Sequence, residues 1–240
     1  MLKIIKVKDY EEMSDQAFDV IKKVVTSRPD SVLGLATGST PIGLYKRMIE
    51  DHEKNGTSYA TVKTVNLDEY LDLPQDHPES YYSFMQQNLF SGLDIPKDNI
   101  HLPEDGEDRD EQCRKYNVIL DQLGIDIQVL GIGSNGHIAF NEPGTPFSMT
   151  THVVDLKEST RQDNARFFDS IDDVPKQAIT MGIANIMQAK QILLLVSSEG
   201  KAEAIAATIN EPETPDVPAS ALQSHPNVVV IVDEAAAKLL

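Results

Sequence analysis

The chain has 240 residues, of which 40% are hydrophobic and 25% are charged, a balance typical of a globular protein with a buried core. A formal net charge of −17 argues against nucleic acid and anionic membrane surfaces as partners, because both require a basic surface on the protein. The single cysteine, Cys113, excludes an internal disulfide and fits a reducing compartment, and its polar neighbours at 110–116 predict an exposed helix.

The apolar runs of the chain are short. None of them approaches the ~20 residues of a membrane span, and residues 1–10 lack the apolar core of a signal peptide and predict a first strand. We therefore expect a soluble, cytoplasmic protein.

Short apolar runs alternate with longer segments of helical period, a pattern typical of a mostly parallel sheet with helices on both faces. The predicted strands are 3–7, 31–36, 61–67, 127–131, 191–196 and 228–232, with a further short strand at 151–155. The predicted helices are 10–26, 41–53, 78–89, 107–123, 175–187 and 200–209. No repeat or linker-like composition interrupts this order, so we expect one α/β domain over 1–240.

In such sheets ligands bind beyond the carboxyl ends of the strands. The first polar segment at a predicted strand end is the loop formed by Thr37, Gly38, Ser39 and Thr40, after which Pro41 opens a helix with Ser39 or Thr40 available as N-cap. Free N–H groups and hydroxyls at a helix start favour an anion, and the loop has neither a Walker nor a dinucleotide pattern, so a phosphate monoester is the expected ligand. The alternative is a plain strand-to-helix turn.

The second segment is NLDEY at 66–70, where Asp68 and Glu69 follow a predicted strand. A carboxylate fixed there is a candidate general base, and burial or neighbouring donors decide its pKa. We interpret Asp68 as the base and Glu69 as a supporting group. The alternative is that Asp68 caps the next segment.

The third segment is GIGSNGHIAFNEPG at 131–144, which follows the apolar run 125–130. Its glycines allow tight turns and close approach of a ligand. His137 and Glu142 lie five residues apart, and an imidazole with a nearby carboxylate is a usable acid/base pair at neutral pH. The alternative is a glycine-rich turn with a structural histidine.

Positive side chains come later in the chain. Arg161 and Arg166 lie in a helical-looking stretch at 151–170, and Lys201 follows a predicted strand at the start of a helix. A lysine at a helix start does not stabilise the helix dipole, so an anionic ligand there would explain it. The alternative for Lys201 is an ordinary surface position.

Four motifs together resemble the glucosamine-6-phosphate deaminase family. They are ATGSTP at 36–41, NLDEY at 66–70, GIGSNGHIAFNEPG at 131–144 and TRQDNARFF at 160–168, and the match runs in order over nearly the whole chain. The resemblance implies an α/β, Rossmann-like fold related to ribose-5-phosphate isomerase and CoA-transferases. It also implies conversion of glucosamine 6-phosphate and water to fructose 6-phosphate and ammonia, in amino sugar catabolism, with no metal and no cofactor.

The resemblance further implies the role of each site residue. Asp68 matches the base that moves the C2 proton, His137 matches the group that opens the pyranose ring, and Glu142 matches its carboxylate helper. Arg166, Lys201 and the loop Thr37–Thr40 match the phosphate cradle.

Two departures from the longer family members bear on catalysis and regulation. Asn135 stands where many of them have Asp, and we expect its side chain to accept a hydrogen bond from the ring of His137 and to fix the tautomer without adding charge. The stretch 148–156 has no Lys or Arg, where the allosteric hexamers have basic residues, and the chain ends at Leu240 without their longer C-terminal segment. The resemblance therefore implies an unregulated short form that is a monomer or a weak homo-oligomer.

The segment 144–175 carries Arg166 and is predicted to be a lid that closes on the sugar phosphate. A 6-phosphogluconolactonase is the nearest alternative enzyme, but a lactonase needs no base over C2, so Asp68 favours the deaminase. A sugar-phosphate sensor is the alternative without catalysis, but it would need a DNA-binding segment, and we expect none before residue 31.

Overall fold

The computed structural model describes residues 2–158, 161–162, 168 and 170–240. Within them, seven strands form one sheet in the order β1-β10-β9-β6-β2-β3-β5, and every neighbouring pair is parallel. These strands are β1 (Leu2–Val7), β2 (Val32–Leu35), β3 (Lys63–Asn66), β5 (Ile100–His101), β6 (Ile127–Leu130), β9 (Ile192–Val196) and β10 (Val228–Asp233). The predicted parallel α/β sheet is confirmed.

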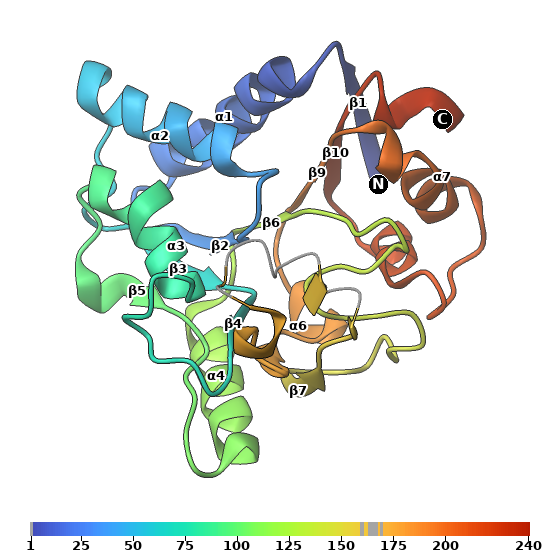
Figure 1. The fold of residues 1–240 in the computed structure, drawn as a ribbon. Coiled ribbons are helices and arrows are strands. Elements are labelled where there is room, and N and C mark those ends of the chain that lie inside the picture. Colours follow the sequence, from blue (N-terminus) through green and yellow to red (C-terminus); the bar gives the residue numbers. More distant parts are fainter. Residues whose placement is uncertain (1, 159–160, 163–167, 169) are drawn as a thin grey trace.

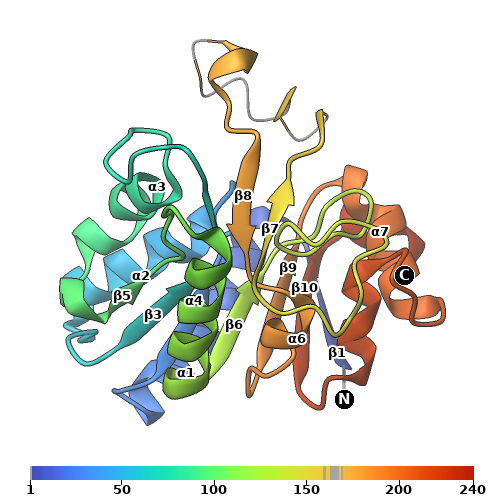
Figure 2. The same ribbon diagram turned by 90° about the horizontal axis from the view of Figure 1, so that it is seen from below.

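Helices cover both faces of this sheet (Figures 1 and 2). The α-helices are α1 (Tyr10–Ser27), α2 (Ile42–Asn55), α3 (Tyr81–Asn88), α4 (Arg109–Leu123), α6 (Ile183–Ile186) and α7 (Ala202–Asn210). The 3-10 helices are η1 (Phe90–Gly92), η2 (Lys97–Asn99), η4 (Ile171–Asp173), η5 (Glu199–Lys201), η6 (Pro218–Ser224) and η7 (Ala236–Leu239). The fold is therefore a Rossmann-like α/β sandwich of three layers.

The strands supply two separate apolar cores because their side chains alternate between the faces. Leu33 and Leu35 of β2 pack with α1, α2 and α3, whereas Val32 and Ala36 pack with α4, α6 and α7. Strands that are buried on both faces are apolar throughout, which is why the sequence showed them as continuous runs.

A second sheet of three antiparallel strands lies at the carboxyl end of the first. It contains β4 (Asp68–Tyr70), β8 (Gln177–Thr180) and β7 (His152–Asp155), in the order β4-β8-β7. β7 and β8 rise beyond the main sheet as an arm, which we call the β7–β8 arm (Figure 2). The predicted strand at 151–155 is confirmed.

The predicted helix at 175–187 is wrong over its first half. Residues Gln177–Thr180 form β8, because Ala178 and Ile179 are buried between β4 and β7, and only the short α6 is helical. Two expectations about helix surroundings are also wrong. Pro41 precedes α2 without any side-chain cap, and Cys113 is buried on α4 rather than exposed.

Within the described ranges, none of the helices combines the length and apolarity that a membrane crossing requires.

Candidate active site

All four polar segments lie at the same edge of the main sheet. Since β9, β6, β2 and β3 are parallel neighbours, their carboxyl ends meet there. The residues that follow these strands are 197–201, 131–144, 36–41 and 67–70, in the same order as the strands. The topology thus brings together segments that are far apart in the sequence.

The loop 131–144 is held in place by backbone and amide hydrogen bonds. The N–H of Gly133 donates to the carbonyl of His137 at 2.9 Å, and Gly136 O accepts from Ala219 N at 2.9 Å. The buried amide of Asn141 donates to Ile138 O at 3.0 Å and to Met181 O at 2.8 Å. The loop is therefore tied both to itself and to the chain beyond β8.

Two of its glycines are required by geometry. Gly136 has φ of 82°, a conformation that favours glycine. Gly133 lies directly against the imidazole, since a Cβ atom there would be 2.2 Å from Cε1 of His137. The position of His137 thus depends on the absence of a side chain at 133.

His137 faces Glu142, and Asn135 supports both. The distance from Nδ1 of His137 to Oε1 of Glu142 is 3.6 Å, and Nδ1 has no hydrogen bond to any described residue. The amide of Asn135 donates to Oε2 of Glu142 at 2.8 Å, while its oxygen accepts the backbone N–H of His137 at 3.2 Å. The expectation that Asn135 accepts a hydrogen bond from the ring is wrong: its oxygen accepts the backbone N–H of His137 instead, and ring Nδ1 has no hydrogen bond to any described residue.

Burial lowers the pKa of His137 below its usual value. The negative charge of Glu142 opposes this shift, and the ammonium groups of Lys201 and Lys157 add to it. The imidazole is therefore mainly neutral near pH 7 and is able to accept a proton.

Asp68 is the first residue of β4 and is paired there with Thr180. It is only 6% exposed, and burial, followed by the charge of neighbouring Glu69, raises its pKa to about 8. Among the described residues, none forms a hydrogen bond with its side-chain carboxyl group. The carboxyl group is thus partly protonated at neutral pH, and its ionised form is a stronger base than an ordinary aspartate.

Glu69 anchors the strand that carries Asp68. Its carboxylate accepts the N–H groups of Tyr70 at 2.8 Å, Tyr81 at 2.9 Å and Tyr82 at 2.8 Å. Two of these donors are the free amides at the start of α3, where a carboxylate also stabilises the helix dipole. The supporting role that we assigned to Glu69 agrees with these bonds.

Side chains also connect Asp68 with the loop 131–144. Thr180, the partner of Asp68, accepts the N–H of Phe140 through Oγ1 at 3.2 Å. The ring of Phe140 stacks on Tyr81 with 6.3 Å between centroids. Burial raises the pKa of Tyr81, and the charge of Asp68 adds to this shift. These contacts connect the strand of Asp68 with the loop that carries His137 and Glu142. Sequence reasoning missed Thr180 because it expected a helix there.

The loop Thr37–Thr40 precedes α2 and turns at Gly38, whose φ is 91°. None of the hydrogen bonds among the described residues uses the N–H groups of Gly38, Ser39 or Thr40. These groups, at the start of a helix of 14 residues, are suitable donors to an anion.

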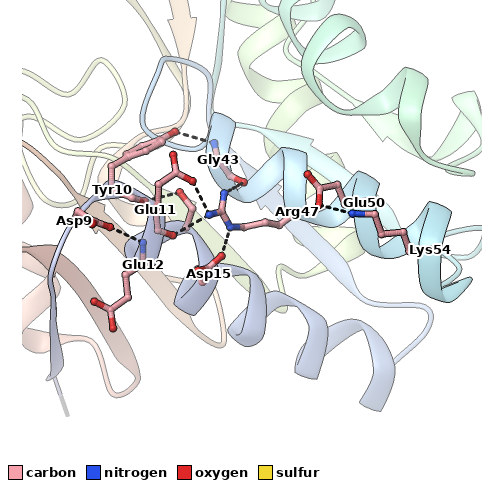
Figure 3. A network of polar contacts seen from close by, with 10 residues as sticks. Asp9, Tyr10, Glu11, Glu12, Asp15, Gly43, Arg47, Glu50 and Lys54 are labelled. Carbon is pink, nitrogen blue, oxygen red and sulfur yellow. Dashed lines mark hydrogen bonds and ion pairs between the residues drawn. The ribbon is translucent and has the colours of Figure 1, made fainter.

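Tyr10 on α1 fixes this loop from outside. Its hydroxyl donates to the carbonyl of Ser39 at 3.0 Å. The same hydroxyl accepts the N–H of Gly43 at 2.8 Å (Figure 3). Arg47 of α2 also joins this helix to α1, through ion pairs with Glu11 and Asp15 (Figure 3). No sequence signal indicated Tyr10, because it lies 29 residues before Ser39.

Of the expected cationic residues, Lys201 ends η5, directly before α7. It lies close enough to His137 for its charge to lower the pKa of the imidazole. Arg161 is engaged within its own region, where Nη2 donates to Ile171 O at 2.7 Å. Arg166 lies outside the described residues. Lys157, which sequence reasoning did not single out, forms an ion pair with Glu142 at 2.9 Å.

A family model described as "Glucosamine-6-phosphate isomerases/6-phosphogluconolactonase" matches residues 8–231. The chain is 56% identical over 241 residues to a glucosamine-6-phosphate deaminase of Geobacillus sp. (strain WCH70), covering 100% of this chain and 96% of the relative. It is 53% identical to the enzyme of the same name from Shouchella clausii (strain KSM-K16), covering 99% and 97%.

Solved structures give a consistent result. A structure described as a monomeric glucosamine-6-phosphate deaminase superposes with a TM-score of 0.96 at 46% identity, covering 99% of this chain and 100% of the other. A 6-phosphogluconolactonase from Trypanosoma brucei gives a TM-score of 0.80 at 20% identity, covering 100% and 99%. The second likeness shows a shared fold alone.

Proposed function

Because the chain belongs to the family of glucosamine-6-phosphate isomerases and 6-phosphogluconolactonases, we propose that it is a glucosamine-6-phosphate deaminase. It converts glucosamine 6-phosphate and water to fructose 6-phosphate and ammonia, in the breakdown of amino sugars. The observation that carries this proposal is the presence of two proton-transfer groups at one sheet edge, the buried Asp68 and the His137–Glu142 pair.

The first step is opening of the pyranose ring. It requires a group that removes the proton of the C1 hydroxyl and returns a proton to the ring oxygen. A mainly neutral imidazole serves this purpose at pH 7, and Glu142 stabilises the imidazolium that forms.

The second step moves a proton from C2 to C1. Ionised Asp68 takes the C2 proton while the C1 carbonyl oxygen takes up a proton from water, which gives an enolamine. Asp68 then delivers its proton to C1 while the amino group releases one to water, which leaves a ketimine at C2 with no net change in protons. Water adds to the ketimine, and ammonia leaves as the C2 ketone of fructose 6-phosphate forms. The buried environment that raises the pKa of Asp68 makes its carboxylate a better base for this transfer.

The substrate phosphate binds to the loop Thr37–Thr40 together with Lys201 and Arg166. The unused N–H groups of Gly38, Ser39 and Thr40 and the start of α2 support the first of these contacts. Arg166 enters this proposal from the sequence resemblance alone. No step of the reaction calls for a metal or a cofactor.

A lactonase remains the alternative within the family. Lactone hydrolysis needs no base over C2, so it gives no reason for a buried aspartate at position 68. The relatives at 56% and 53% identity are named as deaminases, which also favours the first assignment.

The test is ammonia release from glucosamine 6-phosphate, measured together with fructose 6-phosphate. Equal amounts of both products from the wild type, and loss of both in Asp68→Asn, would support the reaction and the base. The Lys23→Met variant, changed at an exposed position of α1, is the control and keeps full activity. Hydrolysis of 6-phosphogluconolactone without ammonia release would favour the lactonase instead.

We further propose that residues 1–240 form one domain in which 144–175 closes over the substrate. The extension of the β7–β8 arm beyond the main sheet and the contact of Lys157 with Glu142 support this (Figure 2). Residues 159–160, 163–167 and 169 of the segment lie outside the described residues. Protease cleavage within 145–172 is expected to slow when fructose 6-phosphate is added, and an unchanged rate would contradict a lid.

We also propose a cytoplasmic protein that acts on a small sugar phosphate and binds neither nucleic acid nor membranes. It is a monomer or a weak homo-oligomer, in line with the monomeric deaminase structure that it resembles. Sedimentation at micromolar concentration tests the oligomeric state. A stable hexamer activated by N-acetylglucosamine 6-phosphate would overturn this part of the proposal.

A further inference from the structure

Lys157 joins the β7–β8 arm to the carboxylate that faces His137. It follows β7 by two residues, and its Nζ lies 2.9 Å from Oε2 of Glu142. The lysine side chain is 50% exposed, whereas that of Glu142 is only 21% exposed. The contact therefore brings a cation from the surface of the arm onto an inner group of the site.

The two oxygens of Glu142 have different partners. Oε2 accepts from the amide of Asn135 at 2.8 Å and from the ammonium of Lys157 at 2.9 Å. Oε1 faces Nδ1 of His137 at 3.6 Å, and this ring nitrogen has no hydrogen bond to any described residue. Two donors on one oxygen fix the carboxylate plane, and the fixed plane keeps the other oxygen in front of the imidazole.

We propose that Lys157 is a positioning residue for the reaction, which holds Glu142 against His137 and couples the β7–β8 arm to the acid/base pair. This inference rests on the proposed function, in which that pair opens the sugar ring. The arm and the loop 131–144 are separate elements, so the ion pair makes the geometry of the catalytic pair dependent on the position of the arm.

The charges around the imidazole support the same role. The groups that face His137 are Glu142 on its own loop, Lys157 from the arm and Lys201 from η5. The two lysines lower the pKa of His137, and Glu142 raises it. Removal of the Lys157 ammonium should therefore raise the pKa of the ring. A half-exposed ion pair contributes little to stability, so folding should be nearly unaffected.

Three variants test this inference. Lys157→Met removes the charge and keeps much of the chain length, Lys157→Arg keeps the charge, and Lys23→Met removes an exposed lysine from α1. The ring pKa of His137 is measured by NMR on histidine-labelled protein, with the signal among the six histidines assigned from His137→Gln. Steady-state ammonia release gives kcat and KM for each variant.

In Lys157→Met we expect the ring pKa to rise by about half a pH unit, as for the loss of one partly screened positive charge a few ångströms away, because the amide of Asn135 still keeps the charge of Glu142 beside the ring. We expect kcat to fall about tenfold with KM little changed, because the acid/base pair is misaligned while the phosphate contacts remain. Lys157→Arg and Lys23→Met should match the wild type in ring pKa. An unchanged ring pKa or an unchanged kcat in Lys157→Met would overturn the inference.

The ring titration needs no substrate. It therefore tests the role of Lys157 separately from the proposed deaminase activity. A wild-type protein that releases no ammonia would count against the proposed function. The ring pKa of Lys157→Met would still decide whether Lys157 acts on the His137–Glu142 pair.

Discussion

The imidazole of His137 occupies the space that a side chain at Gly133 would need. A Cβ atom at position 133 would lie 2.2 Å from Cε1 and 2.3 Å from Nδ1 of the ring. Since these are distances to a side chain, the ring would be the part that moves. The glycine thus leaves room for the proposed proton-transfer group and is not needed for a turn.

Gly133→Ala is expected to reduce deamination by at least about 100-fold, which is the lower range for loss of one acid/base group. The displaced ring no longer faces Glu142, while the backbone remains as it is. Steady-state ammonia release and thermal unfolding measure the two effects separately. Gly131→Ala is the matched control, because nothing lies within 4 Å of a Cβ atom there. Equal activity of the two variants would contradict the argument.

Tyr10→Phe is expected to weaken substrate binding. The hydroxyl holds both Ser39 O and Gly43 N, so its loss loosens the loop proposed to bind the phosphate. KM for glucosamine 6-phosphate should rise several-fold, as for the loss of about 1 kcal/mol of hydrogen bonding, with kcat nearly unchanged.

Arg47→Met is the control for Tyr10→Phe. It breaks the ion pairs of Arg47 with Glu11 and Asp15 between the same two helices but leaves the tyrosine hydroxyl in place (Figure 3). Its KM should match that of the wild type. A similar increase in KM for both variants would indicate general loosening of the helix pair rather than a role of Tyr10.

The main sheet was predictable because its central strands are buried on both faces and appear as apolar runs. Of the second sheet, only β7 was predicted. β4 has only three residues, and β8 has four, of which Ala178 and Ile179 fit a helical pattern as well as a strand. Their strand conformation comes from pairing between Asp68 and Thr180, which are more than 100 residues apart. Such pairing leaves no local signal.

The candidate site likewise has features that the sequence predicted and features that it did not. Asp68, His137 and Glu142 could be proposed from the sequence because titratable residues after apolar strands gather at one sheet edge. Three further features could not be proposed from the sequence: the contact of Asn135 with Glu142, the hydroxyl of Tyr10 and the ammonium of Lys157. Each depends on side-chain directions between separate elements, which residue spacing does not determine.

The pH dependence of activity should reflect the raised pKa of Asp68. The proposed base Asp68 must be ionised to take a proton, and its pKa is raised to about 8, so kcat/KM should rise with pH through that value. Rates of ammonia release between about pH 6 and pH 9.5 measure this rise in kcat/KM. A rate that is already constant from about pH 6 upward would show that another group limits the reaction.

Asp68 should also affect stability. Its pKa is higher in the folded chain than the ordinary value, so the native state binds more protons and the free energy of unfolding falls as pH rises from about 4 to about 8. Asp68→Asn removes this dependence. The variant should gain stability relative to the wild type across that window, by up to about 1.4 kcal/mol for each pH unit. Denaturant unfolding at several pH values measures the free energy of unfolding of both proteins. If it changes with pH equally in the wild type and in Asp68→Asn, the raised pKa of Asp68 is contradicted.

Ser198 has φ of 84° and ψ of 149°, a backbone conformation that is nearly restricted to glycine. It follows β9 by two residues and precedes the proposed phosphate ligand Lys201. Its N–H donates to the carboxylate of Asp233 at 3.1 Å, and Ser197 donates to the same carboxylate through Oγ at 2.5 Å. These bonds hold the strained residue in place.

Ser198→Gly is therefore expected to stabilise the protein. Relief of strain of about 1–3 kcal/mol exceeds the entropic cost of a glycine, about 0.5–1 kcal/mol. A net gain of about 1 kcal/mol corresponds to an increase in Tm of about 2–4 °C for a chain of this size. Ser198→Ala keeps the Cβ atom and the strain, so its Tm should not rise. Calorimetry on the three proteins provides the measurement, and an equal Tm for the glycine and alanine variants would mean that the conformation at 198 stores no strain.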